Sequence, residues 1–187
     1  MKTMRMLAAF CLVSMTMAIA LANAETMELG PAQITMDLSL LGSYSIEKGD
    51  VSTLDHKKPD FRYEIFPASI NVDGTKDRVQ LEVHQMSNSE PLEDSISSKD
   101  PASGLEHCME RSNLLPVGED IQTEPYTIDG YQGELAIFNG DPEKPLYIVA
   151  YSPDKKDGSG SIVCIVSSDF PWENTKSLFD SVKTQLA

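Results

Sequence analysis

Basic residues are scarce in this 187-residue chain, which has 15 lysines and arginines against 29 aspartates and glutamates. The formal net charge of −14 repels phosphate backbones and anionic lipid headgroups. The composition therefore argues against nucleic acid and membrane surfaces as partners, and it leaves basic proteins and divalent cations compatible with the charge. The simpler interpretation is that the charge only keeps an exported protein soluble.

The sequence also lacks the spacing patterns of the common enzyme classes. It contains no G-x-S-x-G nucleophile elbow, glycine-rich phosphate loop or dinucleotide-binding fingerprint. Its three histidines stand in unrelated contexts, with His56 in a charged loop, His84 on a strand and His107 on a predicted helix. His107 and its neighbour Cys108 have no second ligand pair at zinc spacing. We therefore expect neither an enzyme nor a zinc site, and a hydrolase with an unrecognised site stays an alternative.

The first 24 residues have the pattern of a secretory signal peptide. Two basic residues precede an apolar stretch from Met6 to Ala22, and Ala22-Asn23-Ala24 is the small-x-small sequence that signal peptidase recognises. Cleavage after Ala24 would leave residues 25–187 as a single domain with 13 basic and 29 acidic residues, a net charge of −16. This predicts a secreted, periplasmic or cell-surface protein that does not bind the membrane. The alternative is an uncleaved anchor, because about 17 mostly apolar residues is near the lower limit for a membrane span.

Two cysteines remain after this cleavage, Cys108 and Cys164. An even number of cysteines in an exported protein favours a disulfide, and this pair allows one connectivity. The alternative is two buried free thiols, since Cys164 lies in the most apolar stretch of the chain and cysteine buries readily.

The strongest strand signal is at residues 162–166, which read IVCIV. An unbroken β-branched run of this length is typical of a strand covered on both faces, so we place it in the middle of a sheet. Strands at 134–138 and 146–151 precede it at hairpin spacing and predict an antiparallel meander. Alternation predicts further strands at 33–38, 43–48, 61–66 and 79–85, the first two of them pairing as an opening hairpin. In the last of these, Gln80, Glu82 and His84 should form a partly wet face.

Two helices complete the expected fold. Asp100-Pro101 is typical of a helix start, and the helix to about Ser112 has Cys108 on its apolar face. A second helix follows Pro171, with one apolar stripe formed by Leu178, Phe179, Val182 and Leu186. We therefore predict an α+β protein in which helices pack on the faces of an antiparallel sheet of about six to seven strands. This is an αβα sandwich with the C-terminal helix on the sheet.

This order of elements resembles the PsbP-like superfamily, which includes the photosystem II extrinsic subunit and the Ran-binding import factors. The resemblance is carried by the SYSIEK strand at 43–48, the TIDGYQG turn at 127–133 and the run SSDFPWENTKSLFDSVK at 167–183. The last stretch is also similar to short exported proteins of methanogenic archaea. The resemblance implies a sandwich on an antiparallel sheet and, in most relatives, a non-enzymatic role in binding or assembly. No functional residue of the superfamily matches a position of this chain.

Candidate binding residues occur in two places. Asn71, Asp73 and Asp77 offer oxygen ligands to calcium around an Asp-Gly turn, although the twelve-residue calcium loop is incomplete and an ordinary turn is the alternative. Aromatic side chains of the C-terminal third form a candidate recognition surface, with packing in the core as the alternative. These aromatic residues are Tyr126, Tyr131, Tyr147, Tyr151 and Trp172.

These observations predict an accessory protein that binds another envelope or extracellular protein through an exposed sheet edge or an aromatic groove. Its acidity favours a basic partner. A carrier of a small ligand or of calcium is the alternative, and calcium is the one cofactor that the sequence suggests.

Overall fold

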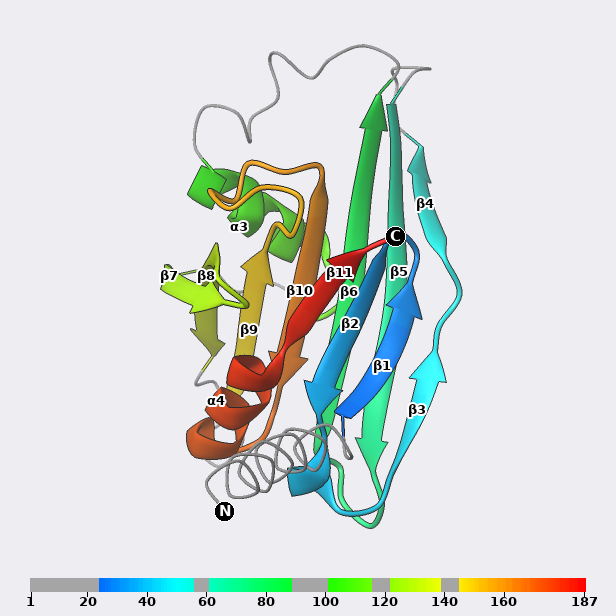
Figure 1. Cartoon of the computed structure of the whole chain (residues 1–187), viewed down its shortest axis with the longest axis vertical. Coiled ribbons are helices and arrows are strands. Elements are labelled where there is room, and N and C mark those ends of the chain that lie inside the picture. The colour runs from blue at the N-terminus through cyan, green and yellow to red at the C-terminus, as the bar shows by residue number, and fades with distance from the viewer. Residues whose placement is uncertain (1–23, 56–60, 89–100, 116–121, 139–144) are drawn as a thin grey trace, which may run out of the picture.

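The computed structural model describes residues 24–55, 61–88, 101–115, 122–138 and 145–187. Its main feature is an eight-stranded antiparallel sheet with a short helix on one face and a second, three-stranded sheet plus a helix on the other (Figure 1). The α+β class and the packing of the C-terminal helix on the sheet are as predicted. The prediction of one sheet of six to seven strands was wrong, since eight strands form the main sheet and three more form the small one.

The strands of the main sheet lie in the order β3, β5, β6, β10, β9, β8 and β7, and β4 also pairs with β5. The strands are β3 (Tyr44–Lys48), β4 (Ser52–Asp55), β5 (Phe61–Val72), β6 (Arg78–Asn88), β7 (Thr123–Ile128), β8 (Tyr131–Phe138), β9 (Leu146–Tyr151) and β10 (Ile162–Ser168). The run at 162–166 lies in β10, which has three strands of this path on each side, so the predicted central strand and the β8–β9–β10 meander are confirmed.

The small sheet consists of β1 (Ala24–Leu29), β2 (Ala32–Asp37) and β11 (Lys183–Leu186), with β2 in the middle. A tight turn joins β1 to β2, and Gly30 supplies its positive φ of 57°. A Cβ atom at Gly30 would lie 2.6 Å from the ring of Phe66, so the turn also approaches β5 closely. The 3₁₀ turn η1 (Ser39–Leu41) then leads to the main sheet.

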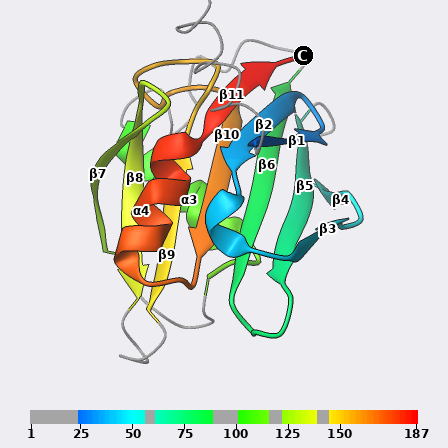
Figure 2. The same cartoon turned by 60° about the horizontal axis from the view of Figure 1, so that its bottom comes forward.

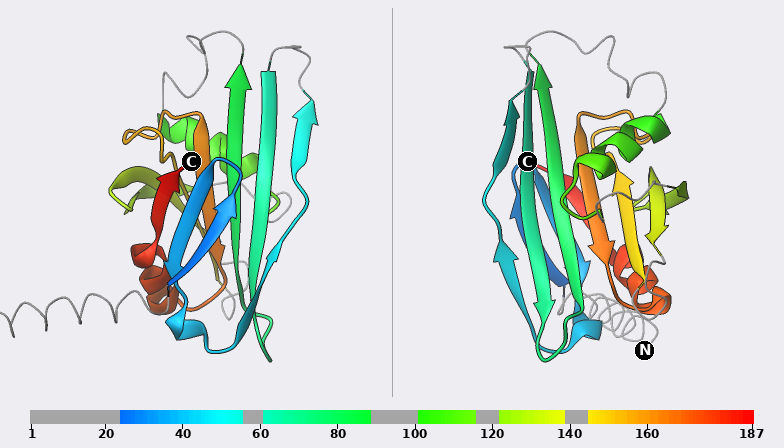
Figure 3. Two further views of the ribbon diagram at one scale, coloured as in Figure 1. Left: turned by 45° about the vertical axis from the view of Figure 1, so that its right-hand side comes forward. Right: turned by 180° about the vertical axis from the view of Figure 1, so that it is seen from behind.

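Two helices cover the main sheet, one on each face (Figures 2 and 3). Helix α4 (Trp172–Ser181) lies on the same face as the small sheet, and Figure 2 shows it in front of β8 and β9. Buried residues of both sheets and of α4 form the core between these layers, among them Met27, Leu29, Ile34, Met36, Ile70, Leu81, Val83, Val149, Val166, Leu178 and Phe179.

Helix α3 (Pro101–Arg111) covers the opposite face and has a core of its own. That core contains Leu105, Cys108, Met109, Leu114, Ala136, Ile148, Ala150, Val163 and Ile165. Successive residues of β10 point to the two cores in turn, as expected of a strand that is buried on both faces.

The predicted C-terminal helix is too long, because α4 ends at Ser181 and β11 begins at Lys183. Leu178, Phe179 and Val182 are fully buried as the apolar stripe predicts, whereas Leu186 is partly buried on the small sheet. The Ser181 hydroxyl accepts the Asp37 backbone N–H at 3.0 Å, which ties the helix end to β2.

The predicted opening hairpin was also wrong. β2 pairs with β1 and β11, and β3 pairs with β5. The signal peptide predicted for residues 1–24 lies outside the described residues except for Ala24, the first residue of β1, so it stays a prediction. Within the described ranges, no helix is long and apolar enough to cross a membrane.

Candidate functional site

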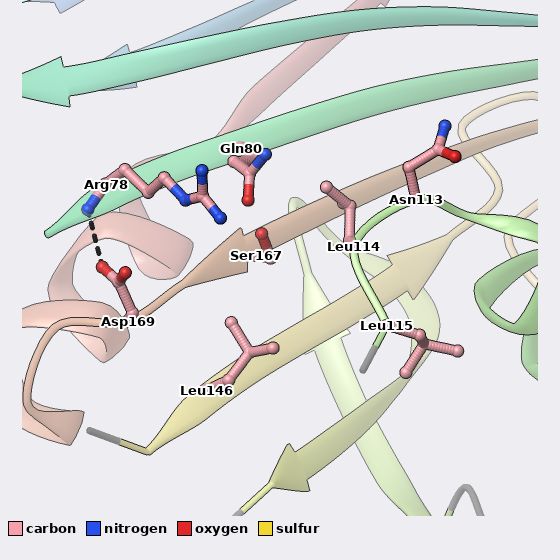
Figure 4. A pocket seen from close by; sticks show the side chains of 8 residues that line it. All are labelled: Arg78, Gln80, Asn113, Leu114, Leu115, Leu146, Ser167 and Asp169. Carbon is pink, nitrogen blue, oxygen red and sulfur yellow. Dashed lines mark hydrogen bonds between the residues drawn. The ribbon is translucent and has the colours of Figure 1, made fainter. Parts of the chain in front are cut away.

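A groove lies beside α3, between the segment that follows this helix and strands β6, β10 and β9 (Figure 4). Its volume is about 360 Å³, within the range of ligand-binding pockets. We call it the β6–β10 groove. Its lining residues are Arg78, Gln80, Asn113, Leu114, Leu115, Leu146, Ser167 and Asp169.

Strand register brings the polar groups of the groove together. Gln80 on β6 is directly opposite Ser167 on β10, and Arg78 precedes Gln80 by two residues on the same face. Figure 4 shows the Gln80 amide and the Ser167 hydroxyl turned toward one another, with the Arg78 guanidinium extended along β6 toward them. One end of the groove therefore presents a guanidinium, an amide and a hydroxyl.

These three side chains have no hydrogen-bond or ion-pair partner in the part of the chain that the structure describes. The Arg78 guanidinium, the Gln80 amide and the Ser167 hydroxyl make no hydrogen bond or ion pair with the residues that the structure describes. In the same part of the chain every buried polar side-chain atom has a hydrogen-bond partner. Ser167 is only 2% exposed, so its hydroxyl reaches solvent only through the groove. The groove thus has hydrogen-bonding groups that are available to a ligand.

Asp169 lies at the same end, just after β10. Its Oδ1 accepts the Arg78 backbone N–H at 2.6 Å, which joins the end of β10 to the start of β6. Burial raises the pKa of the Asp169 carboxyl, and the Arg78 backbone N–H and guanidinium oppose the rise. The apolar part of the lining consists of Leu114, Leu115 and Leu146, and Asn113 lies beyond Leu114 at the end away from Asp169.

Helix α4 fixes the position of Ser167 and Asp169 from the opposite side of the sheet. The hydroxyls of Ser168 and Thr175 lie 2.7 Å apart, and Thr175 donates to the Phe170 carbonyl at 3.0 Å. Ser168 and Thr175 are fully buried. The polar end of the groove therefore lies on a rigid strand end and not on a loose loop.

A buried chain of polar side chains lies next to the groove, behind Asn113. Glu82 and His84 on β6 and Tyr63 on β5 are each at most 2% exposed. Tyr63 Oη lies 2.7 Å from His84 Nδ1, and His84 Nε2 lies 2.8 Å from Glu82 Oε2. Glu82 Oε1 accepts the backbone and side-chain N–H groups of Asn113, at 3.2 and 3.3 Å.

One assignment of hydrogens gives each of these buried side chains, Glu82, His84 and Tyr63, a matching donor or acceptor. The Glu82 carboxylate can only accept, so His84 Nε2 carries the hydrogen and Nδ1 accepts from the Tyr63 hydroxyl. The Tyr63 hydroxyl also forms a hydrogen bond with the Cys108 thiol. The predicted wet face of β6 was thus wrong at Glu82 and His84, because α3 and the segment after it cover both.

The disulfide expected between Cys108 and Cys164 is absent, and both thiols are free. Cys108 belongs to the core under α3 and Cys164 to the core under the small sheet, so the sheet itself separates them. Burial raises the pKa of the Cys108 thiol to about 11 and that of Cys164 to about 12. Both behave as small core residues, and neither is poised as a nucleophile.

The five aromatic residues of the expected recognition surface come together around α4, mainly in the core. Their side chains pack in pairs, with ring centroids 5.0 Å apart for Tyr147 and Trp172 and 6.2 Å apart for Tyr131 and Tyr151. Tyr126 packs edge-on against Trp172 and is partly buried. Tyr147 and Tyr151 are 8% and 0% exposed, so they cannot form an open surface. Core packing therefore fits Tyr147 and Tyr151, whereas Tyr126, Tyr131 and Trp172 are partly buried beside the core.

The expected calcium residues lie at the β5–β6 hairpin. Hydrogen bonds hold the turn, with Asp73 N–H donating to the Ser43 carbonyl at 2.9 Å and Asp77 N–H donating to the Thr75 hydroxyl at 3.0 Å. Asn71 is in the ladder opposite Arg78. No group of three His, Cys, Asp or Glu side chains that could hold a metal occurs among the described residues.

The residues of the β6–β10 groove were not singled out from the sequence. Gln80 was taken for part of a wet strand face, and Ser167 and Asp169 follow the strand that was predicted at 162–166. The available signal was the polar end of an otherwise apolar central strand, next to a helix that must cover the same face. Comparison with protein-family models, curated proteins and solved structures finds no match for this chain.

Proposed function

We propose that this chain is a non-enzymatic binding protein that holds part of a partner polypeptide in the β6–β10 groove. The observation that carries the proposal is the set of unpaired polar groups of Arg78, Gln80 and Ser167 beside an apolar wall of leucines. Binding sites combine a few convergent polar groups with apolar lining in this way. The predicted signal peptide and the excess of acidic residues make it an accessory protein of the cell envelope or the extracellular space.

The burial of the reactive side chains supports a non-enzymatic role. His84 is fully buried, and both described cysteines are buried thiols with raised pKa values. His107 is on α3, 3.5 Å from Glu110, and does not line the groove. A base or nucleophile must reach the substrate, so these groups do not give the groove catalytic machinery. The PsbP-like resemblance points the same way, because most of its members act by binding.

A small-ligand carrier is the second candidate. The volume of the groove, about 360 Å³, also suits a small molecule. A carrier would be stabilised by its free ligand, since a ligand that binds only the folded state raises the unfolding temperature. A thermal-shift screen with small ligands and with calcium therefore separates this candidate from the first.

The test of the first candidate is cross-linking capture from the native envelope and culture medium. The baits are the wild-type chain, the groove variant Leu115→Asp and the control variant Leu40→Asp, with an unrelated acidic protein of equal charge as background. Leu40 is 54% exposed on η1 and does not line the groove, so its variant carries the same added charge elsewhere.

We expect one stoichiometric partner that survives high salt, is retained by Leu40→Asp and is lost with Leu115→Asp. Thermal unfolding of both variants shows whether they are folded. Equal capture by the two variants, or nothing beyond the acidic background, contradicts the proposal. Labelling of the folded wild-type chain by serine or cysteine activity probes would favour the hydrolase alternative.

A further inference from the structure

The polar end of the β6–β10 groove has the chemistry of a receptor for one carboxylate. Among the described residues that line the groove, Arg78 is the one with a cationic side chain. Its guanidinium acts on the nearby Asp169 carboxyl but forms no ion pair with a described side chain. A guanidinium presents a planar fork of N–H donors that matches a carboxylate. The Gln80 amide and the Ser167 hydroxyl are opposite each other on neighbouring strands, so both can donate to the same group.

Asp169 adds an acceptor beside these donors. Its Oδ1 accepts the Arg78 backbone N–H, and its other oxygen accepts no hydrogen bond from another described residue. An acceptor there favours a ligand with an N–H group close to its carboxylate, which a simple fatty acid lacks. The Asp169 carboxylate also disfavours a dianion such as a phosphate monoester. It would repel both negative charges of that ligand, and the Arg78 guanidinium alone would have to offset the repulsion.

The apolar lining of the groove indicates which side chain the ligand has beside its carboxylate. Leu114 and Leu115 come from the segment after α3, and Leu146 is at the start of β9. Together they form an aliphatic wall that would shield an aliphatic side chain from water. The groove thus combines donors for a carboxylate, an acceptor for an N–H group and an apolar wall.

We infer that the β6–β10 groove recognises the carboxyl terminus of a partner polypeptide whose last residue has an aliphatic side chain. The terminal carboxylate binds Arg78, Gln80 and Ser167, and the N–H of the last residue donates to Asp169. The last side chain lies against the leucines. This inference rests on the proposed function and names the part of the partner that is bound.

Overall charge does not prevent this binding. The chain is strongly acidic, but at physiological salt charges more than about 8 Å apart are largely screened. Among the described residues that line the groove, the charged ones are Arg78 and Asp169, and Asp77 also acts on Asp169. A weak dependence of affinity on salt is expected, because one partly enclosed ion pair carries the attraction.

The test uses two fluorescent hexapeptides that end in leucine, one with a free carboxyl terminus and one with a terminal amide. Fluorescence anisotropy with the purified chain should show binding of the free acid and at least tenfold weaker binding of the amide, since a hydrogen-bonded charge is lost. Unlabelled N-acetyl-leucine should compete with the free-acid peptide, and octanoate, which has no N–H group, should compete much less.

Two pairs of variants locate the interaction. Arg78→Gln should weaken binding of the free-acid peptide about tenfold and leave the amide unchanged, whereas Arg62→Gln should change neither. Arg62 is on β5, where it pairs with Glu64 and does not line the groove. Ser167→Ala should weaken the free acid several-fold, and Ser177→Ala on the exposed side of α4 should not. Unfolding curves show whether each variant is folded.

Three results would overturn the inference. Equal binding of the amide and the free acid removes the terminal carboxylate from recognition, and stronger competition by octanoate than by N-acetyl-leucine makes a small acid the ligand. No binding of the free-acid peptide by the folded chain excludes this class of terminus. If Leu115→Asp still abolishes capture of a protein partner in any of these cases, the proposed function stands and only the carboxyl-terminal inference is lost.

Discussion

The substitution Tyr63→Phe should destabilise the protein although it leaves almost no cavity. It removes one hydroxyl that lies 2.7 Å from His84 Nδ1 inside the core. The Nδ1 acceptor is then buried without a donor, and the Cys108 thiol loses its hydrogen-bond partner as well. An unsatisfied buried group costs about 1–3 kcal/mol. For a protein of this size the unfolding temperature should fall by about 2–12 °C.

Combining Tyr63→Phe with His84→Leu tests whether the buried hydrogen bonds of Tyr63, His84 and Glu82 are energetically coupled. His84→Leu alone leaves the Glu82 carboxylate and the Tyr63 hydroxyl without their partner, and breaking a buried pair costs about 3–5 kcal/mol. Once His84 is gone, the Tyr63 hydroxyl no longer has its imidazole partner, so adding Tyr63→Phe should cost little more. The two effects should therefore fall short of additivity by about 1 kcal/mol or more.

Urea unfolding followed by Trp172 fluorescence and by circular dichroism measures these differences as shifts of the midpoint at constant slope. Tyr44→Phe is the matched control, because the Tyr44 hydroxyl bonds to Glu25 at 3.1 Å in an exposed setting and should contribute less than about 0.5 kcal/mol. A Tyr63→Phe variant as stable as that control would refute the reasoning. Strict additivity with His84→Leu would also refute it.

Three further predictions concern other parts of the fold. Burial raises the pKa of the Cys108 thiol to about 11 and that of Cys164 to about 12, so a thiol reagent at pH 8 should label neither in the native protein. After unfolding without reductant both should be labelled, and an unfolded protein with neither thiol labelled would mean a disulfide. Burial raises the pKa of Asp169 above its ordinary 3.8, so this carboxyl favours folding most below that pH, and the benefit is lost as the pH rises through its folded value. In urea titrations, the stability of Asp169→Asn relative to wild type should therefore rise between pH 3 and pH 7, whereas that of the exposed control Asp73→Asn should not. A stability difference between Asp169→Asn and wild type that is the same at both pH values would contradict this. Gly133→Ala should cost about 1–3 kcal/mol in the same assay, because its Cβ would lie 2.5 Å from the Ala150 carbonyl oxygen within the sheet, and a variant as stable as wild type would show that the strands can move apart.

The sequence predicts best where one local pattern has one structural solution. Residues 162–166 are apolar without interruption, and only a strand covered on both faces satisfies such a short run. The C-terminal stripe has two solutions. Leu178, Phe179 and Val182 indicate a helix, but a leucine four residues after Val182 fits both a further helical turn and a strand. The segment forms a strand because it pairs with β2.

Long-range pairing also explains why the groove and the buried chain could not be predicted. Polar residues at alternate positions of β6 predict a wet face, and only the packing of α3 and of the segment after it turns Glu82 and His84 into core residues. Ser167 and Gln80 come from strands more than 80 residues apart in the chain, and their meeting follows from the β6–β10 register. Nothing local in the sequence indicates that register.

The position of β11 has a consequence for the order of folding. Thr184 pairs with Ile34, which lies 150 residues earlier, and closing a loop of that length costs about 4 kcal/mol of chain entropy. The small sheet therefore gains its third strand late, although β1 and β2 can pair with each other before β11 is available.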